Sequence, residues 1–314
     1  MLVNAAGLGA FAAVTAYVTA RWGLVVLMRD WLWVWILGFL LAISLTDLRR
    51  YARGVLVDWL PFVGIIVGYD LLRGMADPSV EQAHYVQQLD AERFLFGGTL
   101  PTQWLQDRLW DYPANGVIHV YDYLVWALYN THFVVTVLVA AVLWKVNRER
   151  FLRFRTMVAV LAFSGMLTFA LFPTLPPWLA FDQGHISEVP RVVQAVWHHT
   201  GWQGSGNIFE GGAQWANPVA AWPSLHAAYP MLLLLFFWHS GRAVRALLIA
   251  YVLAMGFVLV YSGEHYFVDI VGGWAYAGAA FAATTFAYRF VEQRRPVAHV
   301  AQKPQTLYPR PALD

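Results

Sequence analysis

Long apolar runs constrain this chain more than any other feature. Windows of about 20 residues with few charges recur near 3–20, 31–46, 54–72, 117–144, 156–175, 223–239, 244–262 and 266–289. A helix needs a run of that length to cross the hydrocarbon core of a bilayer. Charged residues make up 13% of the chain, about half the share in a soluble domain. We therefore predict an all-α fold, a polytopic membrane helical bundle with about 8 transmembrane helices.

Lys and Arg residues predict the orientation of these helices. They concentrate in three connectors, "TDLRRYARG", "KVNRERFLRFR" and "SGRAVR", and in the C-terminal tail. Two long segments, 73–116 and 176–222, hold few basic residues. Basic connectors stay in the cytoplasm, so both termini are expected inside and both long segments outside. Plasma membrane is the expected location, and no removable signal peptide is expected.

Composition shifts divide the chain into three parts. Residues 1–53 are expected to form N-terminal transmembrane helices, and 54–290 a catalytic membrane core whose outer segments form short interfacial helices. Residues 291–314 are Pro-rich and expected to be a disordered cytoplasmic tail. The chain has no Cys, which excludes disulfides and thiolate metal sites. A nucleic-acid partner is not expected, and the sequence leaves the oligomeric state open.

The stretch "WANPVAAWPSLHAAYP" lies where the second long segment meets an apolar run. Pro223 suits an early helical position, which places Ser224 and His226 in the first turn. The N-terminus of a helix presents free N–H groups and the positive end of the helix dipole. This end therefore suits an anionic ligand, phosphate above all.

The stretch "SGEHYFVDIVGG" has a similar arrangement at the start of the last apolar run. The i, i+4 spacing of His265 and Asp269 predicts that they share a helix face. An Asp beneath a His fixes its tautomer and leaves the other ring nitrogen basic. Glu264 is expected to be a solvated neighbour. One imidazole could then attack phosphorus while the other handles the proton of the leaving or entering oxygen.

The two stretches together resemble the second and third signature motifs of the type-2 phosphatidic acid phosphatase superfamily. The residues that carry this resemblance are Ser224, Leu225, His226, Gly263, His265, Tyr266 and Asp269. It implies a six-helix phosphatase-like core and a phosphohistidine mechanism without metal or other cofactor. His265 would be the nucleophile, Asp269 its orienting partner and His226 the general acid and base. Ser224, Gly263 and Tyr266 would contact the phosphate.

The chain also departs from the superfamily. The first motif, a Lys followed at fixed spacing by Arg-Pro, is absent, and Leu259 stands where the phosphatases carry an Arg six residues before the nucleophile. Instead, "RFLFGGTLPT", "YNTHF" and "FPTLPPW" look like the inositol phosphorylceramide synthase-like branch, whose members transfer a phospho-headgroup between lipids. The resemblance spans roughly residues 85–280.

Phosphoryl transfer needs positive charge near the equatorial oxygens. The cations available in the long segments are Arg73, Arg93, Arg108 and Arg191. Arg93 beside "FLFGG" is the first choice, with Asp90 expected to hold it in place. "FPTLPPW" is expected to end a helix and shape the rim of the site.

Three further groups lie on the fourth apolar run. His119, Asp122 and Tyr123 stand at its outer end, where they could contact a headgroup or form a structural hydrogen-bond network. His132 is about 15 residues inside the run, or roughly 20 Å deep. It is therefore expected to pack far from the site.

The preferred hypothesis is a phosphotransferase acting at the outer leaflet, with membrane lipids as donor and a lipid or polyol as acceptor. With water as acceptor, the same residues would make a phosphatase for lipid phosphates or polyprenyl pyrophosphates. In another class, His226, His265 and Asp269 could ligate a metal. A lipid transporter or scramblase is the third alternative.

Overall fold

The computed structural model describes residues 2–23, 29–61, 63–64, 80–200 and 217–294. Throughout these ranges the secondary structure is helical, with isolated bridges in the connecting segments. The predicted all-α class is therefore confirmed. The end of the predicted span 54–72, Arg73 and most of the C-terminal tail lie outside the described residues.

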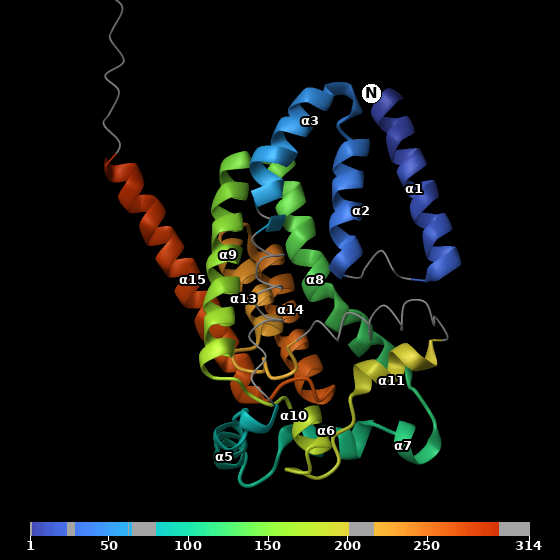
Figure 1. Cartoon of the computed structure of the whole chain (residues 1–314), viewed down its shortest axis with the longest axis vertical. Helices are drawn as coiled ribbons and strands as arrows, with labels where there is room; N and C mark the ends of the chain where they lie inside the picture. The colour runs from blue at the N-terminus through green and yellow to red at the C-terminus, as the bar shows by residue number, and fades with distance from the viewer. Residues whose placement is uncertain (1, 24–28, 62, 65–79, 201–216, 295–314) are drawn as a thin grey trace, which may run out of the picture.

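The long helices form an elongated bundle (Figure 1). Four described helices are long and apolar enough to cross a membrane, and a fifth is α8 if its two bent halves count as one span. These are α1 (Leu2–Trp22), α9 (Arg148–Leu171), α14 (Arg242–Tyr261), α15 (Phe267–Arg294) and α8 (Val120–Val146). The polytopic membrane bundle is thus confirmed, whereas the number of eight spans stays a prediction.

Three further predicted spans overlap with shorter described helices. They are α2 (Arg29–Ala42), α3 (Leu48–Gly54), which continues as a π-helical turn over Val55–Trp59, and α13 (Leu225–Phe236). The start of α9 also differs from the prediction. Asn147 accepts a hydrogen bond from the Arg150 amide and caps α9 there, so the helix begins eight residues before residue 156.

Short helices gather at one end of the bundle, at the bottom of Figure 1. They come from the two long segments, as expected: α5 (Val86–Leu95), α6 (Pro101–Leu109), α7 (Tyr112–Asn115), α10 (Pro177–Asp182) and α11 (Val192–His199). The N-terminus and the C-terminal end of α15 lie at the opposite end, together with α3 and its arginines. The chain therefore separates its basic connectors from its long segments, as the charge pattern predicts.

Helix α13 packs against α8, α9, α14 and α15. Its contact with α15 is close because α15 carries Gly273 at the crossing. A Cβ atom there would lie 2.2 Å from the carbonyl oxygen of Ser224. A hydrogen bond also joins the Ser224 amide to the Asp269 carbonyl oxygen at 2.9 Å. These backbone contacts bring the N-terminal ends of α13 and α15 together.

The segment "FPTLPPW" follows α9, which ends at Leu171 as predicted. Thr174 is fully buried, and its backbone bridges to His84 and Ala220. Its hydroxyl accepts a hydrogen bond from the Trp222 amide at 2.7 Å. This segment therefore holds the chain immediately before α13 in place.

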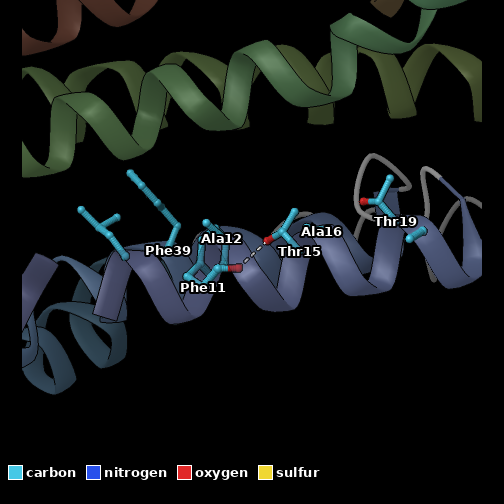
Figure 2. Close-up of a pocket in the computed structure, with 8 residues that line it drawn as sticks. Phe11, Ala12, Thr15, Ala16, Thr19 and Phe39 are labelled. Atoms are coloured by element: carbon cyan, nitrogen blue, oxygen red, sulfur yellow. Dashed lines mark hydrogen bonds between the residues drawn. The ribbon is translucent and has the colours of Figure 1, made fainter. Parts of the chain in front are cut away.

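Helices α1 and α2 pack against each other at the edge of the bundle. Figure 2 shows a groove on α1, in which the Thr15 hydroxyl donates to the Phe11 carbonyl oxygen. The groove is lined by Leu8, Phe11, Ala12, Thr15, Ala16, Thr19, Ala20 and Phe39. None of these side chains is ionisable, so this groove lacks the groups that phosphoryl or proton transfer needs.

Candidate active site

Helix α13 begins at Leu225, with Ser224 as its N-cap. The Ser224 hydroxyl accepts a hydrogen bond from the Ala227 amide at 3.3 Å. This cap sets the helix start, so the predicted helical position of Pro223 is wrong: Pro223 lies one residue before the cap. His226 is the second helical residue and lies in the first turn, as expected.

A tight turn connects α14 to α15 and carries His265. Gly263 has a φ of 76°, a left-handed conformation that favours glycine. A Cβ atom there would lie 3.0 Å from Val189 and 3.2 Å from the Pro190 carbonyl oxygen. The Gly263 carbonyl accepts a hydrogen bond from the Trp178 amide. In the structure Gly263 thus shapes the loop that presents His265.

The predicted shared helix face of His265 and Asp269 is wrong, because α15 begins only at Phe267. The two side chains still meet. Asp269 folds back, and its Oδ2 atom accepts a hydrogen bond from the Tyr266 amide at 2.9 Å. The same oxygen lies 3.5 Å from His265 Nδ1. Asp269 therefore caps its own helix and faces the imidazole at once.

The two predicted histidines are neighbours. His226 Nδ1 lies 3.2 Å from His265 Nε2, with the ring centroids 5.2 Å apart. His265 is 4% exposed and Asp269 is fully buried. With Nδ1 of His265 toward the carboxylate, its Nε2 faces His226. One proton is shared across this contact, because one of the two nitrogens must donate and the other accept.

His132 contradicts the expectation that it lies far from the site. Its ring centroid is 3.9 Å from that of His226, and its Nδ1 donates to the Tyr129 carbonyl oxygen at 2.6 Å. Helix α8 bends by 45° between its halves 120–132 and 134–146. The depth argument assumed a straight helix and a site at the bilayer edge, and the bend sits beside His132.

Glu264 is not solvated as expected: it is 5% exposed and pairs with Arg191. Arg191 Nε lies 2.6 Å from Glu264 Oε1, and Nη2 lies 3.0 Å from Oε2. The guanidinium also lies over the Trp178 ring at 4.7 Å. Burial lowers the pKa of Arg191, but the paired Glu264 carboxylate outweighs this effect and the pKa is raised, which keeps the guanidinium charged.

Arg191 is connected to the histidines through α8. Tyr129 interacts with the Arg191 side chain, and its ring stacks on His226 with centroids 5.0 Å apart. Of the four arginines considered from the sequence, Arg191 thus contacts a neighbour of each histidine: Tyr129, which stacks on His226, and Glu264, which precedes His265.

The other candidate cations lie at the surface or outside the described residues. Arg93 and Asp90 on α5 are exposed, and within the described ranges no hydrogen bond or ion pair joins their side chains. Arg108 lies over Trp104 and donates to its carbonyl oxygen. Arg73 lies in the undescribed stretch. At Leu259 the side chain is fully buried in an apolar cluster, so no cation can come from that position.

The His119 trio makes structural contacts. The Asp122 carboxylate accepts hydrogen bonds from the His119 amide at 2.8 Å and from the Tyr261 hydroxyl at 2.6 Å. His119 also pairs with Asp111 at 2.8 Å. Tyr123 lies against His199. These contacts cap α8 and join it to α14, which matches the structural alternative.

Two further buried groups border the site: Tyr266, which the sequence motif includes, and Glu92, which the sequence did not single out. Tyr266 is 1% exposed, and its hydroxyl has no hydrogen-bond partner among the described residues. Glu92 on α5 is fully buried and contacts α15. Glu92 lies in a polar segment without a clear hydrophobic repeat, so its sequence does not predict which side chains are buried. Among the described residues, no three His, Cys, Asp or Glu side chains converge as a metal site would require.

Comparison with known families identifies the superfamily to which the chain belongs. Residues 98–283 match the model of the PAP2 superfamily, and this match covers more than half of the chain. The protein belongs to that superfamily. It is an enzyme acting on lipid phosphate esters, a phosphotransferase or a phosphatase, and the resemblance inferred from the motifs is confirmed.

Two relatives have names that combine an inositol phosphate group with a ceramide. The phosphoinositol dihydroceramide synthase of Bacteroides thetaiotaomicron is 28% identical over 232 residues, which cover 70% of this chain and 73% of the relative. The inositol phosphorylceramide synthase catalytic subunit of Saccharomyces cerevisiae is 24% identical over 197 residues, 58% of this chain but only 47% of the relative. No solved structure matches the chain.

Proposed function

We propose that this enzyme transfers a phospho-headgroup, inositol phosphate, between lipids through a phosphohistidine intermediate. The observation that carries the proposal is the contact of His226 Nδ1 with His265 Nε2 at 3.2 Å, at the starts of two helices. Nucleophile and proton donor must lie within hydrogen-bond reach in such a mechanism. The similarity to two inositol-type synthases supports the choice of headgroup.

In the first step, His265 Nε2 attacks the phosphorus of phosphatidylinositol. The bond from phosphorus to the glycerol oxygen breaks, and His226, which enters this step as the imidazolium, donates a proton to that oxygen, which leaves as diacylglycerol. Asp269 holds His265 in the reactive tautomer and balances the positive charge that develops on the ring. The helix N-termini of α13 and α15 add positive potential at the phosphate.

In the second step, a lipid hydroxyl of the ceramide class attacks the phosphohistidine. His226, now neutral, takes the hydroxyl proton, and the bond from phosphorus to His265 breaks. Both residues return to their starting state. If water entered instead, the same steps would release inositol phosphate.

Arg191 is the cation that we assign to the transferred phosphate. Its guanidinium interacts with Tyr129 and forms an ion pair with Glu264, the residue next to His265. The remaining phosphate contacts are assigned to Ser224, Gly263 and Tyr266, which lie within two residues of His226 or His265 in the chain. Arg93 on the exposed side of α5 is assigned to the bilayer surface.

The active site is proposed to face the outer leaflet. The starts of α13 and α15 lie at the end of the bundle that carries the short helices (Figure 1). The basic connectors lie at the other end, which the positive-inside rule assigns to the cytoplasm.

The test is turnover of labelled phosphatidylinositol by purified protein, with and without ceramide. We expect phosphoinositol-ceramide with ceramide present, and its loss in His226→Ala and His265→Ala. His239→Ala, an exposed histidine beyond the other end of α13, is the matched control.

Phosphatidic acid and polyprenyl pyrophosphate are tested in parallel. Release of phosphate from these, without transfer, would replace the proposal by the phosphatase; full turnover by both histidine variants would overturn it. Activity lost in chelator would favour the metal alternative, and lipid flipping that survives His265→Ala would favour the transporter.

A further inference from the structure

Helix α5 packs on the start of α15 through a buried acid. Glu92 is 0% exposed, and its Oε1 atom accepts a hydrogen bond from the Val268 amide at 3.0 Å. The Phe267 amide contributes a second backbone interaction. These amides belong to the first turn of α15, whose N–H groups have no partner within the helix. Glu92 thus caps from another helix the turn that carries Asp269.

The other carboxyl oxygen of Glu92 has an unusual environment. Oε2 is buried and has no hydrogen-bond partner among the described residues. A buried, unsatisfied carboxyl oxygen is costly, so a purely structural cap would be better made by a neutral side chain. The charged group beside Glu92 is Asp269 from the first turn of α15, and Tyr266, next to His265, lies near both carboxyl groups. The unsatisfied oxygen therefore belongs to a cluster that includes the partner of His265.

Glu92 titrates in the physiological range. Burial and, to a smaller extent, the charge of Asp269 raise its pKa to about 7 against the opposing effect of the Val268 and Phe267 amides. Below pH 7 the side chain is neutral and can still accept from Val268. Above pH 7 it places a second negative charge beside Asp269.

We propose that Glu92 is a positioning residue of the active site, which fixes the first turn of α15 and thereby the geometry of Asp269 and His265. The inference rests on the proposed role of His265. Helix α5 makes no contact with the reacting atoms in this scheme and acts through α15. Loss of the cap would loosen the turn and misplace the imidazole, and a shift of about 1 Å can cost ~10²-fold in rate.

The kinetic test compares Glu92→Ala and Glu92→Gln, with Glu81→Gln, an exposed acid before α5, as control. In the phosphatidylinositol assay we expect Glu92→Ala to lower kcat by about tenfold or more and to change KM little. Glu92→Gln keeps the acceptor oxygen and should match wild type at pH 6. At pH 8 its kcat should differ from that of wild type, because only wild type then carries a second negative charge beside Asp269. Equal kcat and equal pH profiles in all three variants would overturn the proposal.

A second measurement does not depend on the assigned reaction. Hydrogen exchange of peptides covering residues 265–270 is followed in the substrate-free protein. We expect faster exchange in Glu92→Ala and wild-type exchange in Glu92→Gln at pH 6. If no lipid substrate is turned over, the proposed function fails while this result still decides whether Glu92 holds the turn. Unchanged exchange in a folded Glu92→Ala protein would overturn the positioning role.

Discussion

His226 Nδ1 and His265 Nε2 face each other at 3.2 Å across the start of two helices that are separated by a third helix in the chain. Two backbone contacts enforce this proximity: the hydrogen bond from the Ser224 amide to Asp269, and the close approach of Gly273 to Ser224. The contact between the two histidines therefore depends on the backbone packing of α13 and α15.

Asp269→Asn is expected to abolish most of the turnover without unfolding the protein. The amide oxygen of Asn can still accept from the Tyr266 amide, so the turn keeps its cap. The Asn side chain cannot hold His265 in the reactive tautomer or balance the positive charge on the imidazole. The same loss lowers kcat by about 10⁴-fold in a comparable triad. Turnover and the thermal midpoint are measured together. Activity within a few-fold of wild type would contradict the orienting role of Asp269.

Gly273→Ala is expected to destabilise the protein and to reduce activity. The added Cβ would meet a backbone carbonyl at 2.2 Å, and backbone cannot move aside as a side chain can. Such overpacking typically costs about 1–3 kcal/mol. The matched control is Gly278→Ala on the same helix, where nothing lies within 4 Å of the added atom. It should be neutral or stabilising, because Ala favours a helix by about 0.5–1 kcal/mol over Gly. Equal thermal midpoints for the two variants would refute the claim that the close approach of α13 and α15 requires glycine at residue 273.

Arg191→Ala is expected to damage both stability and turnover. It leaves Glu264, which is 5% exposed, as a buried charge without its guanidinium. Breaking a buried pair in this way costs about 3–5 kcal/mol. The double variant Arg191→Ala/Glu264→Ala should recover part of the stability and none of the activity. Arg242→Ala, an exposed arginine at the start of α14, serves as the control. Recovery of activity in the double variant would remove Arg191 from the phosphate site.

The free energy of unfolding is expected to fall as pH rises from about 4.5 to about 7. Folding raises the pKa of Glu92 from 4.5 to about 7, so the folded state binds its proton more tightly than the unfolded chain. The stabilisation from this group is fully present below pH 4.5 and is lost as pH passes the folded value. Thermal midpoints in detergent at pH 5 and pH 8 measure the effect in wild type and Glu92→Gln. The same pH difference in both proteins would assign it to other groups.

Much of the site could be predicted from local pattern. The apolar runs and their lengths predicted membrane helices, since a bilayer imposes a fixed span. The basic connectors predicted which loops share one end of the bundle. Short motifs around His226 and His265 predicted the chemical pair, because each motif lies at a helix start and its residues are close in the chain.

Contacts between distant segments were decided by the tertiary structure alone. Glu264 looked solvated in the sequence, yet Arg191, 73 residues away, pairs with it in a buried position. His132 looked too deep, yet a bend in α8 accompanies its contact with His226. Glu92 could not be identified as a site residue from the sequence, because its contacts depend on the packing of α5 on α15. The membrane helices and the two histidine motifs could be predicted from the sequence, because they follow from local composition and spacing. The charged partners of those groups depend on which helices pack together, and only the folded structure decides that.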